Sequence, residues 1–313
     1  MTVSEIDGVY APVLTPFDRD LAIDQAAFSG YCGWLVSHGV GLCVFGTNSE
    51  ANSLTVGERV AALEALRAAG IAGDRLMPGS GACAVGDAVE LSRAALACEA
   101  RAVLMLPPFY YKKVSEEGLF AAFSQVIEQV GDERLKIVLY NIPQVSGVAI
   151  TPGLVARLVK AYPRTIAGVK ESTGIVDNTL RLLETFPDLR IFPASEALLA
   201  QTVRHGAAGC ISAGANINPA AIVDLLARLR AGAAAGGEDD PVVKVRRLLE
   251  AGDMIAGAKH IVATFAGYPG FARVRPPLRE IAAVDGDRLI AALRALEFSM
   301  PGLKSALSGS VGH

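Results

Sequence analysis

The stretch Ile166-Ala167-Gly168-Val169-Lys170-Glu171-Ser172-Thr173-Gly174 carries a lysine from the end of an apolar run into a turn of small and polar residues. If residues 166–169 form a short buried strand, Lys170 leaves the sheet at its carboxyl edge, where parallel α/β proteins place their chemistry. Because an ammonium group is costly to desolvate, a lysine there either pairs with an acid, such as Glu171, or becomes a nucleophilic amine. Taken alone, the stretch favours the structural ion pair.

The strand-then-helix pattern around Lys170 repeats along most of the chain. The predicted strands are residues 9–14, 41–45, 74–78, 102–106, 135–140, 166–169, 189–192 and 209–212. The predicted helices begin at Asp24, at about Thr55, at Val85, Ser115, Thr151, Val176, Glu196 and Pro219. Eight such units over roughly 230 residues predict an α/β fold, a (β/α)8 TIM barrel, rather than an open sheet.

A helical extension is predicted after the barrel. Residues 231–240 are rich in glycine and alanine and suggest a hinge. Helices are expected at residues 244–251, 254–265, 278–283 and 288–296, and a frayed tail after Pro301. We therefore divide the chain into a catalytic barrel, residues 1–230, and a carboxyl-terminal helical appendage packed on it, residues 231–313.

Composition limits the partners of this 313-residue chain. Its 51% hydrophobic and 19% charged residues indicate a large core, as expected when parallel strands are buried on both faces. A net charge of -3 gives no broad basic field, so we expect no nucleic acid and no membrane partner. No export signal is visible, which favours a cytoplasmic protein with a small-molecule substrate. The five scattered cysteines are interpreted as small core residues.

Chemically useful side chains follow several of the predicted strands, where a barrel builds its functional face. They are Thr47-Asn48-Ser49, Phe109-Tyr110-Tyr111, Tyr140-Asn141, Lys170 and Ser212. Tyr140 and Lys170 are about one βαβ repeat of roughly 30 residues apart, which predicts neighbouring strand ends. The 47–49 turn offers hydroxyl, amide and backbone N–H groups, a suitable nest for a carboxylate.

A lysine beside a tyrosine and a carboxylate nest fits the attack of an amine on the ketone of a 2-oxo acid. Lys170 would form the imine, which acts as the electron sink, so we expect no cofactor and no metal. Tyr140 would transfer protons, and Thr47 with Asn48 would hold the carboxylate.

Each of these residues also has a structural explanation. Tyr140 alone would more often be an aromatic packed at the barrel rim, and residues 47–50 could simply cap a helix. Tyr110 and Tyr111 could plug a loop or contact another subunit. Their conjunction is what favours an enzyme.

The chain resembles the class I pyruvate-dependent aldolases and lyases that include dihydrodipicolinate synthase and N-acetylneuraminate lyase. The matching pieces are Thr15-Pro16-Phe17, Gly46-Thr47-Asn48-Ser49-Glu50, Pro107-Pro108-Phe109-Tyr110, Tyr140-Asn141-Ile142-Pro143 with Gly147, Gly168-Val169-Lys170-Glu171-Ser172, and Gly209-Cys210-Ile211-Ser212 with Asn216. The resemblance implies Lys170 as the Schiff-base lysine and Tyr140 as the proton-transfer tyrosine. It implies substrate contacts at Thr47, Asn48 and Ile211. It also implies that Tyr110 of a neighbouring subunit enters the site as a proton-relay residue, and that the protein is a homotetramer or at least a dimer.

Two departures from the family pattern bear on the substrate. The usual turn has threonine and glycine where this chain has Asn48 and Ser49. Dihydrodipicolinate synthases also carry an arginine, which grips the second substrate's carboxylate, where this chain reads Gln144-Val145-Ser146. A neutral valine cannot replace that bidentate contact, which argues against aspartate semialdehyde as the second substrate.

Hydroxylated 2-oxo acids fit better. Ser195 and Glu196 stand where sugar-acid lyases of the family contact hydroxyl groups, with Ser212 nearby, although the two residues could equally cap and begin the seventh helix.

The leading hypothesis is a Schiff-base-forming lyase or aldolase acting on pyruvate or a hydroxylated 2-oxo acid. The alternatives are 4-hydroxy-tetrahydrodipicolinate synthase proper, a 2-keto-3-deoxy sugar acid dehydratase, and a catalytically silent 2-oxo acid sensor. A metal-dependent aldolase is disfavoured because His38, His205, His260 and His313 form no visible ligand cluster.

Overall fold

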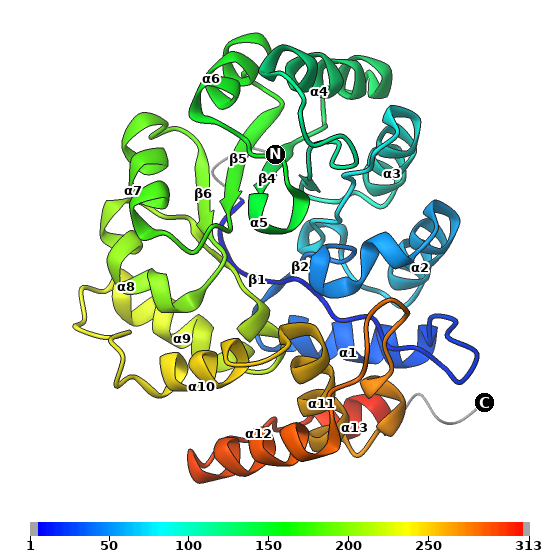
Figure 1. Ribbon diagram of the computed structural model, residues 1–313, viewed down its shortest axis with the longest axis vertical. Coiled ribbons are helices and arrows are strands. Elements are labelled where there is room, and N and C mark those ends of the chain that lie inside the picture. Colours follow the sequence, from blue (N-terminus) through cyan, green and yellow to red (C-terminus); the bar gives the residue numbers. More distant parts are fainter. Residues whose placement is uncertain (1–5, 309–313) are drawn as a thin grey trace.

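Parallel strands occupy the centre of the molecule and helices surround them (Figure 1). The computed structural model describes residues 6–308. The strands in this range are β1 Gly8–Ala11, β2 Gly41–Leu42, β3 Val103–Met105, β4 Ile137–Asn141, β5 Ile166–Glu171, β6 Arg190–Pro193 and β7 Gly209–Ile211. They pair in parallel in the orders β2-β1-β7 and β3-β4-β5-β6.

Backbone hydrogen bonds close these two groups of strands into one barrel. On one side, Ala208 N donates to Ile191 O at 2.9 Å. On the other side, residues 76–79 lie between β2 and β3, where Met77 N donates to Leu42 O and Leu104 N donates to Pro78 O, each at 2.8 Å. The predicted TIM barrel is confirmed.

The prediction of a third regular strand at residues 74–78 is wrong. Its beginning forms the 3₁₀ helix η4 (Gly73–Arg75), and isolated parallel bridges join Leu42 to Leu76 and Gly79 to Leu104. Pro78 has no amide hydrogen and therefore removes one bond of the ladder. The segment still occupies the place of a strand in the barrel.

Most predicted barrel helices are confirmed, and so are their caps. The helices are α1 Gln25–Ser37, α2 Val56–Ala68, α3 Val85–Ala97, α4 Glu116–Val130, α6 Pro152–Ala161, α7 Val176–Thr185 and α9 Pro219–Arg230. The side chains of Asp24, Thr55, Ser115 and Thr151 each accept a hydrogen bond from an amide in the first turn.

Two helical segments differ from the prediction. The seventh helix is not continuous, because residues 196–205 divide into η5 (Glu196–Leu198), α8 (Leu199–Thr202) and η6 (Val203–His205). Thr202 Oγ1 donates back to Leu198 O at 2.8 Å, a contact that disturbs a regular helix. The short helix α5 (Pro143–Ser146) was not predicted, and it ends at Gly147 in the left-handed conformation.

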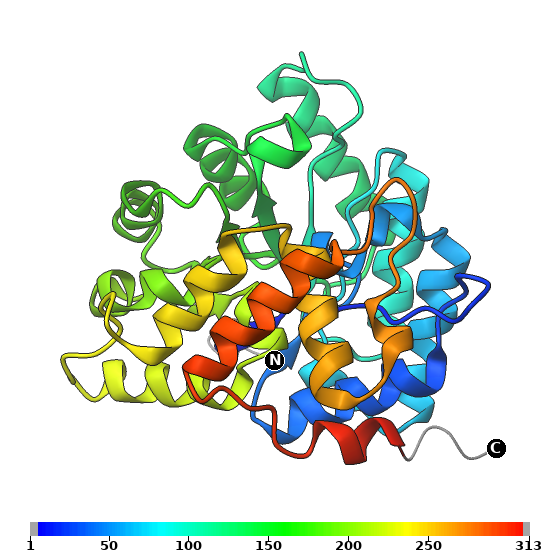
Figure 2. The ribbon, with the colours of Figure 1, turned by 60° about the horizontal axis from the view of Figure 1, so that its bottom comes forward.

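The carboxyl-terminal helices pack beside α1 and α9 at one side of the barrel (Figures 1 and 2). They are α10 Pro241–Glu250, α11 Met254–Ala266, α12 Ala283–Ala295 and α13 Leu303–Ser308. Phe271 is fully buried, and its ring centroid lies 4.8 Å from that of Tyr31 in α1. Barrel and appendage therefore share a continuous core.

Two predictions for this region are wrong. Residues 278–282 are not helical, and α12 begins only at Ala283. Pro276 and Pro277 lie in a turn that Leu278 N closes by donating to Arg275 O at 3.0 Å. As far as Ser308, the tail after Pro301 is not frayed, since α13 buries Leu303 and Leu307, and the rest of the tail lies outside the described residues. Trp34 Nε1 also donates to Pro301 O at 2.9 Å.

The cysteines are all unpaired thiols. Cys32, Cys43, Cys98 and Cys210 are buried, as predicted, but Cys83 is exposed. Cys83 lies in the loop between residues 76–79 and α3, at the carboxyl rim of the barrel, where no core surrounds it. Within residues 6–308, no helix combines the length and apolar character needed to cross a membrane.

Candidate active site

Lys170 and Tyr140 lie side by side at the carboxyl end of the barrel. They are register partners on β5 and β4, as their spacing predicted. Both side chains are 3% exposed, and Lys170 Nζ lies 4.1 Å from the centroid of the Tyr140 ring. The ammonium group therefore rests on an aromatic face inside the barrel.

The ion pair between Lys170 and Glu171 is not present. Because successive side chains of a strand point to opposite faces, Glu171 faces away from Lys170. Its carboxylate instead accepts hydrogen bonds from Asn141 Nδ2 at 2.7 Å and from Thr173 N at 2.8 Å. Within residues 6–308, Lys170 Nζ has no acidic partner.

The turn after β2 reaches the same place. Thr47 Oγ1 lies 3.2 Å from the Tyr140 hydroxyl, which joins the turn to the Lys170 pair. Thr47–Ser49 form the 3₁₀ helix η2, and Glu50 after it is left-handed with φ 58°. Asn48 is half-buried, whereas the Ser49 hydroxyl is committed to Val13 O and Gly46 N.

The interior beneath this group is apolar. Its lining side chains include Tyr10, Cys43, Met77, Leu104, Val138, Phe192 and Ile211. Burial raises the pKa of the Cys43 thiol to about 12, and the nearby charge of Lys170 opposes that shift. Water-poor surroundings of this kind strengthen electrostatic effects on a bound substrate.

Tyr110 does not join the group within one chain. Tyr110 and Tyr111 are each 73% exposed, and their ring centroids lie 5.2 Å apart. The pair stands on the loop after β3, and both rings are open to solvent.

Ser195, Glu196 and Ser212 belong to a buried network beside the site. Ser195 Oγ accepts from Ala197 N at 3.3 Å and so caps η5, while the Ser212 hydroxyl donates to the Glu196 carboxylate. Arg246 of α10 lies 3.7 Å from Glu196 Oε2 and donates to Ser212 Oγ at 3.1 Å. These polar groups are thus already engaged with the appendage.

Two buried cations of the appendage were missed by the sequence analysis. They are Arg246 in α10 and Lys259 in α11, and both pair with acids that follow barrel strands, Glu196 and Glu50. Only the apolar periodicity of these helices could have hinted at their burial, because their partners are far away in the sequence.

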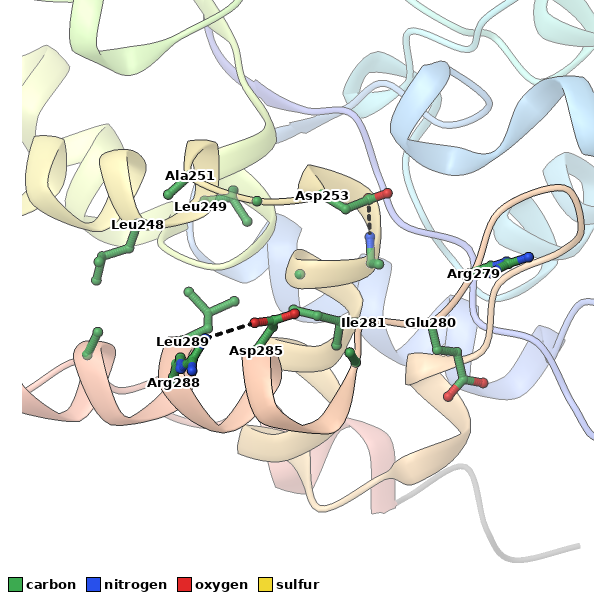
Figure 3. A pocket seen from close by; sticks show the side chains of 15 residues that line it. Leu248, Leu249, Ala251, Asp253, Arg279, Glu280, Ile281, Asp285, Arg288 and Leu289 are labelled. Atoms are coloured by element: carbon green, nitrogen blue, oxygen red, sulfur yellow. Dashed lines mark hydrogen bonds and ion pairs between the residues drawn. The ribbon is translucent and has the colours of Figure 1, made fainter.

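A separate pocket of about 660 Å³ lies among α10, α11 and α12 (Figure 3). Leu248, Leu249 and Leu289 contribute apolar lining, and Asp285 pairs with Arg288 at 3.4 Å on its rim. It contains none of the predicted site residues. In residues 6–308 no three histidine, cysteine or acidic side chains gather as metal ligands, and His313 lies outside that range.

Comparisons with known proteins show the family of this chain. The model of the dihydrodipicolinate synthetase family matches residues 5–295. An uncharacterized DapA-like lyase of Chloroflexus aurantiacus is 35% identical over 214 residues, which are 67% of this chain and 71% of the relative.

Solved structures agree as well. Dihydrodipicolinate synthase from Agrobacterium tumefaciens has a TM-score of 0.84 and 35% identity, covering 92% of this chain and 99% of that chain. The prophage protein YagE from E. coli K12, of the dihydrodipicolinic acid synthase family and solved in complex with pyruvate, has a TM-score of 0.82 and 26% identity, covering 93% and 99%.

Proposed function

Since the chain belongs to the dihydrodipicolinate synthetase family and is therefore a Schiff-base-forming lyase or aldolase, we propose that Lys170 forms the imine with pyruvate or a hydroxylated 2-oxo acid. One observation carries this assignment. The Lys170 amine is buried in the barrel against Tyr140, with no acid paired to it among residues 6–308.

The reaction uses the amine as nucleophile and electron sink. The neutral amine of Lys170 attacks the keto carbon, the former carbonyl oxygen takes up protons and leaves as water, and a protonated imine remains. A carbon–carbon or carbon–oxygen bond at the neighbouring positions can then break or form, because the imine accepts the electron pair.

Tyr140 and Thr47 supply proton transfer. The Tyr140 hydroxyl lies 3.2 Å from Thr47 Oγ1, and its ring lies against the Lys170 amine, so the hydroxyl can hand protons to the departing oxygen and take them from the reacting hydroxyl. Thr47 and Asn48 hold the substrate carboxylate at the start of the η2 turn, because the first amides of a helical turn have no partner within the turn. Ile211 supplies an apolar wall from β7.

Borohydride trapping tests the proposal. Reduction in the presence of pyruvate should add one pyruvate-derived mass per chain, and Lys170→Ala should abolish the adduct. Lys160→Ala removes an exposed lysine of α6 and serves as the matched control, with full labelling expected. An adduct that persists in Lys170→Ala would refute the assignment, and labelling without turnover of any 2-oxo acid would indicate the silent sensor.

The second substrate is proposed to be something other than aspartate semialdehyde. Gln144 Nε2 donates to Ser172 O at 2.5 Å, and the neutral Val145 is 62% exposed. The nearby Lys112 ammonium donates to the carbonyl oxygens of Phe109 and Ser146 and is a point charge, so it does not supply the bidentate grip of an arginine on a second carboxylate. Mass spectrometry of adducts from a panel of hydroxylated 2-oxo acids should identify better substrates, including sugar acids of the 2-keto-3-deoxy type. Rapid turnover in a coupled assay with aspartate semialdehyde would instead establish 4-hydroxy-tetrahydrodipicolinate synthase.

The protein is proposed to act as a homotetramer built as a dimer of dimers. The exposed Tyr110–Tyr111 pair supports this, because tyrosines are enriched in protein interfaces and Tyr110 could complete a neighbour's site. Light scattering on a size-exclusion column measures the assembly, and a monomer with full activity would contradict it.

A further inference from the structure

The carboxylate-binding turn is anchored from outside the barrel. Glu50 follows the Thr47–Ser49 turn and is 3% exposed. Its carboxylate accepts from Lys259 Nζ at 2.5 Å and from the backbone N of Arg275 at 2.7 Å. Both donors belong to the carboxyl-terminal appendage, more than 200 positions along the chain, so the turn and the appendage are one structural unit.

Lys259 is held as tightly as Glu50. Its side chain is fully buried, and its ammonium lies 4.3 Å from the centroid of the Phe17 ring. Burial lowers the pKa of Lys259 to about 8, and the Glu50 charge opposes this shift. A buried charge without its partner is strongly unfavourable, and each member therefore fixes the other.

The backbone of the turn depends on this anchor. Glu50 has a left-handed φ of 58°, a conformation that a residue with a side chain adopts at a cost in free energy. Glu50 N donates to Thr47 O and Ala51 N donates to Gly46 O, so a change at Glu50 is transmitted directly to Thr47 and Asn48.

We propose that Lys259 is a positioning residue, which sets the geometry of the Thr47–Asn48 carboxylate site by holding Glu50. This inference rests on the proposed function, because it assumes that the turn binds the 2-oxo acid. Lys259 acts chiefly on substrate affinity, since Lys170 and Tyr140 are carried by β5 and β4, and Lys259 by α11. Its effect on proton transfer passes only through Thr47, so the rate at saturation should change less than the affinity.

Trapping rates as a function of pyruvate concentration separate the two effects. Lys259→Met keeps the length of the side chain and removes its charge. We expect the pyruvate concentration at half-saturation to rise at least about tenfold, while the rate at saturation falls less than about threefold. A lesion that only destabilised the fold would lower the amount of active protein and leave the half-saturation concentration unchanged.

Two further variants complete the test. Ile261→Ala removes a fully buried apolar side chain from the same helix and leaves both hydrogen-bond donors to the Glu50 carboxylate in place, so its half-saturation concentration should match the wild type. Glu50→Gln keeps the shape and one acceptor of the anchor and should raise the half-saturation concentration severalfold. If Lys259→Met does not fold, the half-saturation concentration of Glu50→Gln decides whether the Lys259–Glu50 pair positions the turn.

The outcomes are distinguishable. Values within about twofold of the wild type for Lys259→Met, or for Glu50→Gln where that variant decides, would overturn the role of Lys259 and leave the proposed function standing. An equal rise in Ile261→Ala would do the same. A wild-type protein that forms no pyruvate adduct would overturn the proposed function, and this inference with it.

Discussion

The ring of Tyr140 and its hydroxyl do different things for Lys170. The centroid of the ring lies 4.1 Å from Lys170 Nζ, while the hydroxyl oxygen lies 3.2 Å from Thr47 Oγ1. Substitutions can therefore remove the proton-transfer group and leave the packing around the lysine unchanged.

Tyr140→Phe should lower turnover by about 10²- to 10⁴-fold, because a positioned acid–base group contributes about this much. The pyruvate adduct of Lys170 should still form, since the amine and its aromatic support remain. Steady-state rates and the mass of the trapped protein measure both effects. Tyr162→Phe, which removes an exposed hydroxyl bonded to Glu128, is the control, and equal turnover in the two variants would refute the role.

Residue positions within the barrel were predictable, and those that join barrel to appendage were not. The spacing of Tyr140 and Lys170 reflects one βαβ unit, so their pairing could be anticipated from the chain. The partner of Glu50 could not, because Lys259 is separated from it by 209 positions and no local pattern links them.

Elements were predictable where local chemistry decides them. Caps such as Ser115 and Thr151 act within one turn and were found. The strand predicted at residues 74–78 was wrong because the place of this segment in the barrel is set by neighbouring strands and not by a ladder of its own, which Pro78 interrupts. The seventh helix was misjudged because Glu196 and Ser195 are held by tertiary and capping contacts.

The start of α2 should respond to acid. Hydrogen bonds from the Arg275 guanidinium and from Thr55 lower the pKa of Glu58 to about 2. A carboxyl whose pKa is lower in the folded state stabilises above its ordinary pKa of 4.5, and this stabilisation is lost as the pH falls from 4.5 towards 2.

Glu58→Gln should therefore lower the free energy of unfolding by about 1–2 kcal/mol at pH 7, with allowance for solvent screening, and by nearly nothing near pH 2. Urea titrations at several pH values measure the difference. Glu117→Gln removes a surface partner of Arg157 at an equivalent helix start, and should cost less than about 0.5 kcal/mol. A Glu58→Gln effect that did not change with pH would contradict the linkage.

The division of the chain into a barrel and an appendage at residue 230 follows the sequence pattern, but the two parts pack as one core. Phe271 packs on Tyr31, and Trp34 bonds to Pro301, so α1 lacks its cover when the appendage is removed. Without the appendage, the buried carboxylates of Glu50 and Glu196 also lose their cationic partners, Lys259 and Arg246.

A fragment of residues 1–230 should therefore fail to unfold cooperatively and should form no pyruvate adduct. Circular dichroism during heating and borohydride trapping measure these properties, with the full chain as the reference. A fragment with a sharp transition and normal labelling would show that the barrel is an autonomous domain.

The exposure of Cys83 gives the molecule a natural attachment point for a fluorophore. Four of its five thiols are buried, so a thiol-reactive dye should modify one group per native chain and five per denatured chain. The single dye would stand on the rim of the barrel, in the loop before α3, on the same side as Lys170. Its emission could then report substrate arrival in real time, without any engineered residue.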